Sequence, residues 1–126
     1  MSISASGFRK HYQKISGNLI VATTTDDTTI VAAVTNHTIY LQKVYVSITG
    51  ASAGKTWTLD DNAGTPRQLA GPWPTDTDGS HFEADYGSEG VPCTQGQALL
   101  FNVSATGAAG VVTWEGYIKR TGVAAA

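Results

Sequence analysis

The sequence predicts an all-β protein, a single-domain antiparallel β-sandwich of the jelly-roll type. Short runs rich in β-branched residues alternate apolar with polar positions, and no convincing apolar repeat at helical spacing interrupts them. Gly, Pro, Asn and Asp separate these runs at spacings typical of sandwiches and barrels. A chain of 126 residues is long enough for one domain with a core of its own.

Three strands are expected in the first half of the sandwich. Residues 18–25 (NLIVATTT) form the first, and residues 28–34 (TTIVAAV) follow an acidic turn. The longest run is residues 39–50 (IYLQKVYVSITG), in which one face carries Val44, Val46 and Ile48. Ile39 and Leu41 are out of phase with that face, so the sequence predicts a β-bulge near Gln42.

The second half supplies the remaining strands. Residues 55–61 (KTWTLDD) alternate with Trp57 facing inward, and residues 98–104 and 111–120 alternate in the same way. The segment 71–92 is rich in Gly, Pro, Asp and Ser, so we expect a long loop carrying one short strand, HFEAD at 81–85. This loop and the Greek-key-like spacing favour a jelly roll over a simple meander.

The two ends of the chain differ from the sandwich, which we expect to span residues 17–120. Residues 1–16 lack strand-like alternation and read as an N-terminal arm, and residues 121–126 read as a featureless tail. The arm combines cationic and aromatic side chains. We therefore predict that it binds a partner through Phe8, Arg9, Lys10 and Tyr12.

Composition argues against several classes of partner. Charged residues make up 14% of the chain, against roughly 25% in an average domain. The formal net charge is -2 and no basic run occurs, so nucleic acid is not an expected partner. No segment approaches the about 20 apolar residues of a membrane span, and the first residues lack the apolar core of a signal peptide. We expect a protein made in a cytoplasm that does not enter a membrane.

No residue set has the spacing of a catalytic or metal site, so we expect neither an enzyme nor a cofactor. Cys93 is the only cysteine and lacks the electropositive setting of a reactive thiolate. The three histidines do not have zinc-ligand spacing. Residues 76–85 match part of a calcium loop, but Pro74 and Asp85 would stand at its first and twelfth ligand positions. An acidic turn is therefore the expected structure there.

The three tryptophans are the remaining residues that could indicate a core or a binding site. Trp57 and Trp114 occupy inward positions of alternating strands, so we expect both in the core. Trp73, in the sequence GPWP, is held between two prolines on the predicted loop, where we expect partial exposure. Such an aromatic anchors a partner or a sugar, or else folds back over the edge of the sandwich.

A resemblance to a known class of proteins covers roughly residues 19–120, and four sequence patterns carry it. They are IVAAV at 30–34, I-x-L-x-K-V from Ile39, T-x-G-x-A-L-x-F-N from Thr94 and G-x-V-x-x-x-G-Y from Gly110. With these patterns the chain resembles small β-sandwich structural proteins encoded in the head-gene regions of tailed bacteriophages. The patterns determine a fold and contain no catalytic motif.

The resemblance implies a viral structural protein, namely a capsid decoration (cement) protein on the outside of a phage head. It further implies a jelly-roll homotrimer at or near threefold axes, with the major capsid protein and other copies of this chain as its partners. Head-fibre and tail-tip proteins use similar sandwiches, so these locations remain open. The competing hypothesis is a carbohydrate-binding or receptor-binding module that uses Trp73, Asp76 and Asp78.

Overall fold

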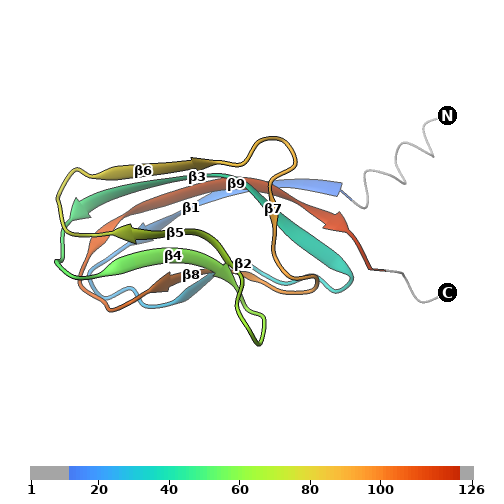
Figure 1. Ribbon diagram of the computed structural model, residues 1–126, viewed down its shortest axis with the longest axis horizontal. Coiled ribbons are helices and arrows are strands. Elements are labelled where there is room, and N and C mark those ends of the chain that lie inside the picture. The colour runs from blue at the N-terminus through green and yellow to red at the C-terminus, as the bar shows by residue number, and fades with distance from the viewer. Residues whose placement is uncertain (1–11, 123–126) are drawn as a thin grey trace.

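The structure is a computed structural model that describes residues 12–122, and within this range every regular element is a β-strand (Figure 1). Two layers of antiparallel strands face one another, which confirms the predicted all-β sandwich. The strands are β1 (Tyr12–Val21), β2 (Thr28–Val31), β3 (His37–Gly50), β4 (Thr56–Asp61), β5 (Gln68–Pro74), β6 (His81–Asp85), β7 (Val91–Pro92), β8 (Leu99–Val103) and β9 (Ala109–Arg120).

The strand order is that of a jelly roll. One layer, sheet A, has the order β1-β9-β3-β6, with β7 paired to β3, and the other, sheet B, has the order β2-β8-β4-β5. When the two-residue β7 is left out, the first strand pairs with the last, the second with the second-last, β3 with β6, and β4 with β5. This nested pairing defines the jelly roll, and it confirms the predicted topology.

The core lies between the two sheets and is built from alternate residues of each strand. In β3, Ile39 and Leu41 face inward, and so do Val44, Val46 and Ile48. The register with β9 shifts between Leu41 and Lys43, which is the predicted bulge near Gln42. The extra residue restores the inward phase, because side chains in a strand alternate with a period of two.

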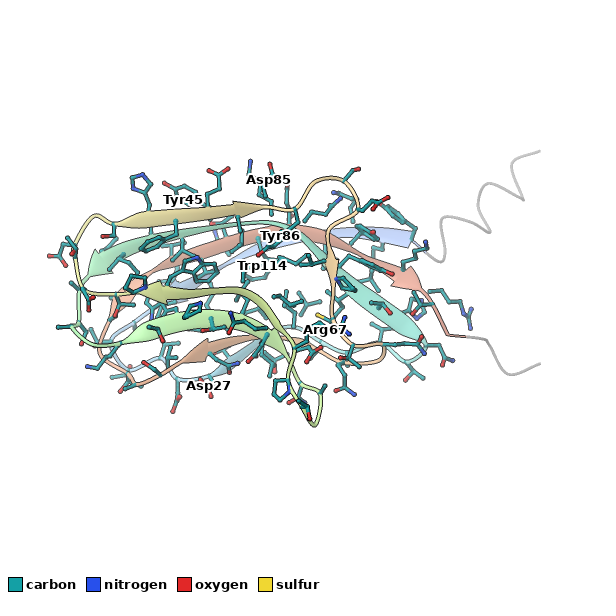
Figure 2. The ribbon with its side chains drawn as sticks, in the orientation of Figure 1. Asp27, Tyr45, Arg67, Asp85, Tyr86 and Trp114 are labelled. Carbon is teal, nitrogen blue, oxygen red and sulfur yellow. The ribbon has the colours of Figure 1, made fainter. Side chains whose placement is uncertain are left out.

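Trp57 and Trp114 belong to the core, as predicted. Trp57 is 1% exposed and makes an edge-on contact with Phe101, with ring centroids 5.4 Å apart and an interplanar angle of 75°. Figure 2 shows Trp114 between the two layers of the sandwich. The sandwich therefore forms around large aromatic side chains contributed by both sheets.

The predicted N-terminal arm is too long, because β1 begins at Tyr12. Residues Tyr12–Ser16 pair with Lys119–Glu115 of β9 in an unbroken antiparallel register. Of these five residues only Ile15 is half-buried, and the other four are exposed. The segment therefore shows little of the apolar–polar alternation that identifies a strand. Backbone pairing with β9, and not a local sequence pattern, makes this segment a strand. The rest of the predicted arm, and the tail from residue 123, lie outside the described residues.

The predicted loop at 71–92 is also wrong in part. Residues Gly71–Pro74 belong to β5 and Val91–Pro92 form β7, whereas the short strand predicted at 81–85 is β6. Prolines are tolerated in β5 because it is an edge strand of sheet B, with one side free of ladder hydrogen bonds. Trp73 is consequently placed inward, opposite Trp57 across the β4–β5 pair, and is 7% exposed.

Candidate functional site

The solvent-facing side of sheet A carries most of the large exposed apolar side chains that the structure describes. Four large hydrophobic residues are exposed within residues 12–122, and three of them, Tyr12, Ile20 and Tyr45, lie on this face. Ile20 is 75% exposed, the highest value of the four. The fourth, Val34, lies in the turn after β2. We call the solvent-facing side of β1, β9, β3 and β6 the outer face of sheet A.

A stack of three tyrosines crosses one end of the outer face. The ring centroid of Tyr117 lies 4.8 Å from that of Tyr12 and 4.6 Å from that of Tyr40, with interplanar angles of 21° and 11°. The three rings come from β1, β9 and β3, which lie side by side in the sheet (Figure 1). The Tyr117 hydroxyl donates a hydrogen bond of 2.7 Å to the Glu89 carbonyl, and burial raises the pKa of Tyr117. The stack is therefore a fixed feature of the surface.

A groove of about 530 Å³ lies beside the stack, between two rows of side chains that cross the strands. In the row between them, Trp114 and Val44 turn their side chains inward and Gly17 has none, so backbone forms much of the floor. The side chains on β1 and β9 are mostly short, which keeps the groove open toward β1. One row is Ser16, Glu115 and Lys43, and the other is Asn18, Thr113 and Tyr45.

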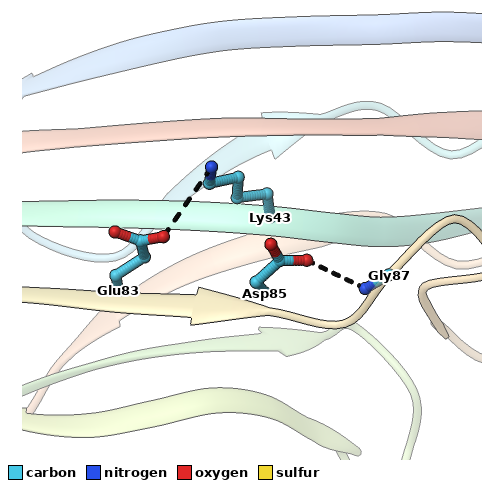
Figure 3. A network of polar contacts seen from close by, with 4 residues as sticks. All are labelled: Lys43, Glu83, Asp85 and Gly87. Carbon is cyan, nitrogen blue, oxygen red and sulfur yellow. Dashed lines mark hydrogen bonds and ion pairs between the residues drawn. The ribbon is translucent and has the colours of Figure 1, made fainter.

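Charged groups of β6 lie beside the end of the groove that Lys43 and Tyr45 of β3 form. The Lys43 ammonium lies 3.7 Å from a carboxylate oxygen of Glu83, and an Asp85 carboxylate oxygen accepts a hydrogen bond of 3.0 Å from the Gly87 amide (Figure 3). Tyr45 stacks on His81 with centroids 6.0 Å apart. Figure 2 shows Tyr45 and Asp85 along this side of the molecule. These contacts hold the aromatic ring of Tyr45 at the end of the groove.

The bulge residue Gln42 connects this region to a neighbouring loop. Its side-chain oxygen accepts a hydrogen bond of 2.6 Å from the Lys14 ammonium, and its side-chain nitrogen donates one of 2.6 Å to the Ser88 carbonyl. A second hollow of about 290 Å³ lies over these groups. The β-bulge therefore does more than correct the phase of β3, because it also ties β1 and the loop after β6 to the outer face.

The aspartates of the calcium-like segment hold a turn together. An Asp76 oxygen accepts a hydrogen bond of 2.8 Å from the Gly54 amide, and an Asp78 oxygen accepts one of 2.6 Å from the Ala51 amide. Both bonds fix the connection between β3 and β4. Within residues 12–122, no group of three or more His, Cys, Asp or Glu side chains is arranged to hold a metal ion.

Asp61 is a buried carboxylate that the sequence analysis did not single out. One of its oxygens accepts hydrogen bonds from the amides of Arg67 at 2.8 Å and Ala63 at 3.3 Å, and the other accepts one from the Thr94 amide at 2.7 Å. Burial raises the pKa of this carboxyl, but the hydrogen bonds from amides outweigh burial and hold the pKa below its usual value. The side chain ties the β4–β5 loop to the loop before β8.

Cys93 is a buried free cysteine. Burial is the main cause that raises the pKa of its thiol to about 12, and the neighbouring Asp61 carboxylate adds to this. The protonated thiol is a poor nucleophile at neutral pH because the thiolate is the reactive form. The position is therefore suited to packing and not to covalent chemistry.

Of the predicted partner-binding residues, the structure describes two, Tyr12 and Trp73, and it places them apart, on the outer face of sheet A and in the core. Tyr12 lies on the outer face of sheet A, stacked against a tyrosine that the sequence analysis did not select. Trp73 lies in the core, so the prediction of an exposed anchor there is wrong. Phe8, Arg9 and Lys10 lie outside the described residues. The residues that the analysis missed, Tyr40 and Tyr117, become neighbours only when their strands pair.

No protein-family model matches the chain, and no curated protein is significantly similar to it. Over the range that the structure describes, there is no helix of the length and apolar character that a membrane crossing requires. The outer face of sheet A is the candidate functional site.

Proposed function

We propose that this chain is a non-catalytic virion structural protein, a capsid decoration protein that binds the outside of a tailed-phage head as a homotrimer. Two features support the proposal: the jelly-roll topology, and the four strand patterns that resemble phage head proteins. Its partners would be other copies of the chain and the major capsid protein, and its location the capsid surface.

The observation that carries the proposal is the concentration of Tyr12, Ile20 and Tyr45 on one face of one sheet. Tyrosine is enriched at protein interfaces because a large apolar ring is combined with a polar hydroxyl. A low-charge surface also suits subunit packing, since charged residues are depleted from the centres of interfaces.

Decoration requires a rigid body that makes many modest contacts. A symmetric oligomer multiplies one weak contact through avidity, so no single residue of each copy has to bind strongly. The tyrosine stack and the Asp61 hydrogen bonds contribute the rigidity. The aspartates near the β3–β4 turn serve the same purpose, because they satisfy backbone amides.

The test combines mass in solution with co-sedimentation on undecorated capsids. The proposal expects a homo-oligomer that saturates capsid sites and raises the resistance of the capsids to heat. Replacing two exposed residues of the outer face, Tyr12→Ser with Ile20→Ser, should weaken sedimentation. The matched control Val34→Ser, which removes an exposed apolar residue elsewhere, should not. A protein that does not sediment with capsids overturns the proposal.

A second candidate function is a carbohydrate-binding or receptor-binding module of a head fibre or tail tip. The burial of Trp73 and the structural hydrogen bonds of Asp76 and Asp78 remove the residues first assigned to it. The groove beside Tyr45 favours it instead, because pockets for small ligands combine an aromatic surface with a few polar groups. Titration with soluble neutral oligosaccharides should then shift the NMR signals of the groove residues. The Tyr45→Ala substitution should abolish these shifts.

A further inference from the structure

We propose that the free edge of β1 pairs in antiparallel fashion with β1 of a second copy, so that two A sheets join around a two-fold axis. This contact goes beyond the proposed function and does not depend on it. A strand at the edge of a sheet presents a row of unpaired backbone amides and carbonyls, which is a template for another strand. Within residues 12–122, β1 pairs with β9 on one side and with no strand on the other.

From Ile15 onward, β1 lacks the devices by which proteins normally protect an edge. It has ten residues, and its register with β9 runs from Tyr12 to Val21 without a shift. From Ile15 to Val21 it contains no charged residue and no proline. Ile20 in this segment is the most exposed of the large hydrophobic side chains that the structure describes. The strand is therefore long, regular and uncharged along most of its free edge.

The other four edge strands are each protected. β7 pairs only with β3 and has two residues, of which one is a proline. β6 has five residues and carries Glu83 and Asp85. β2 has four residues, and its register with β8 is irregular. β5 contains Pro72 and Pro74, and its register with β4 shifts twice. Short length, charge, proline and bulges are the common means of preventing edge pairing. The contrast singles out β1 as the edge available for a partner.

A second copy of β1 is the occupant that this sequence suits. A two-fold axis at Asn18 sets Ser16 opposite Ile20 and Gly17 opposite Leu19, while Lys14 faces the uncharged Ala22. No like charges meet across this pairing, whereas an axis at Lys14 would set two lysines directly opposite one another, which is unfavourable. The axis at Asn18 is therefore the preferred register.

The pairing at Asn18 also continues the core. Ile15 and Leu19 face inward at the margin of the sandwich and are only partly buried against the core. Gly17 has no side chain, and the indole of Trp114 fills the space beneath it. Leu19 of the second copy would then lie next to that indole, so two partly buried margins would cover each other. Burial of apolar surface supplies the driving force, and the backbone ladder supplies the geometry.

The edge contact can coexist with a threefold contact, in a hexamer, because the two contacts have different symmetry. A threefold contact closes a ring, and a two-fold contact joins two such rings or two single copies. Edge pairing therefore predicts an even number of copies, a dimer or a hexamer. A strand from another protein that pairs with β1 would instead leave the isolated chain with one or three copies.

The test uses the full chain and opposite charges at the axis. Asn18→Lys and Asn18→Glu each place like charges directly opposite, so each alone should raise the dissociation constant of the two-fold contact about fivefold. An equimolar mixture of the two variants should bind more tightly than either alone, as measured by sedimentation velocity at low salt. The matched control is the pair Thr113→Lys and Thr113→Glu, on the same face but one strand further in.

The outcomes separate this contact from the decoration proposal. An even-numbered wild-type assembly, weakened by each Asn18 variant and restored by mixing, supports edge pairing. A wild-type mass of one or three copies overturns it, and so does a mixture that behaves like the single variants. Circular dichroism establishes that each variant is folded, and the mixture is informative even if one variant is less stable. Capsid co-sedimentation is measured separately, so failure of one proposal does not imply failure of the other.

Discussion

Gly17 of β1 lies directly opposite Trp114 of β9, and the indole of Trp114 occupies the space that a side chain at Gly17 would need. A Cβ atom at Gly17 would lie 2.7 Å from Cζ2 of Trp114. The glycine therefore permits the largest side chain of β9 to extend beneath the edge strand. This contact fixes both the packing of β1 and the inner margin of its free edge.

Gly17→Ala should destabilise the fold by about 1–3 kcal/mol, the usual cost of overpacking a well-packed site. The ring of Trp114 is enclosed by the core and has little room to move away from the added methyl group. The measurement is the free energy of unfolding from urea denaturation. Gly64→Ala is the control, because a Cβ atom there meets nothing within 4 Å. Equal stability of the two variants would contradict the packing described.

Trp73→Ala should cost about as much as Trp57→Ala, roughly 3–5 kcal/mol for a core aromatic. Both side chains belong to the core cluster, and the two residues pair across β4 and β5. Tyr45→Ala serves as the control, since that ring is 41% exposed, and it should cost far less. Thermal or urea unfolding decides the matter: a nearly neutral Trp73→Ala variant would mean that Trp73 is an exposed anchor after all.

Stability should fall in acid partly because of Asp61. Its pKa in the folded protein is below the ordinary value of 3.8, so its contribution is present above that pH and is lost as the pH falls through the lowered pKa. Asp61→Asn should cost roughly 1–3 kcal/mol at pH 7, because the new amide group faces the Thr94 amide donor. The same variant should lose less stability than the wild type on acidification. Urea unfolding at neutral and acid pH measures both effects, with Asp85→Asn as the exposed control.

Cys93 should react with a thiol reagent only when the protein unfolds. The pKa of about 12 leaves almost no thiolate at pH 8, and the side chain is buried. We expect slow labelling in buffer and rapid labelling in denaturant, followed by absorbance of the released chromophore. Rapid labelling of the folded protein would show that the loop before β8 opens readily.

The sequence by itself determined the strand content and much of the inward-facing set. The period of two that places Trp57, Trp114 and the apolar face of residues 44–48 in the core is a local property of each strand. The bulge near Gln42 and the short strand at 81–85 follow from the same kind of information. These features can be predicted from the sequence because a strand with one buried face alternates apolar and polar residues over a few neighbouring positions.

Only the tertiary structure decided the features that depend on pairing between distant segments. Residues Tyr12–Ser16 form a strand because β9, about a hundred residues later in the chain, provides their backbone partners. Trp73 turns inward because it pairs directly with the buried Trp57 of β4, in an edge strand where its flanking prolines are tolerated. The stack of Tyr12, Tyr117 and Tyr40 exists only where β1, β9 and β3 lie side by side. Local polarity carries no information about which strand will become a neighbour, so the candidate site appears only in the assembled sheet.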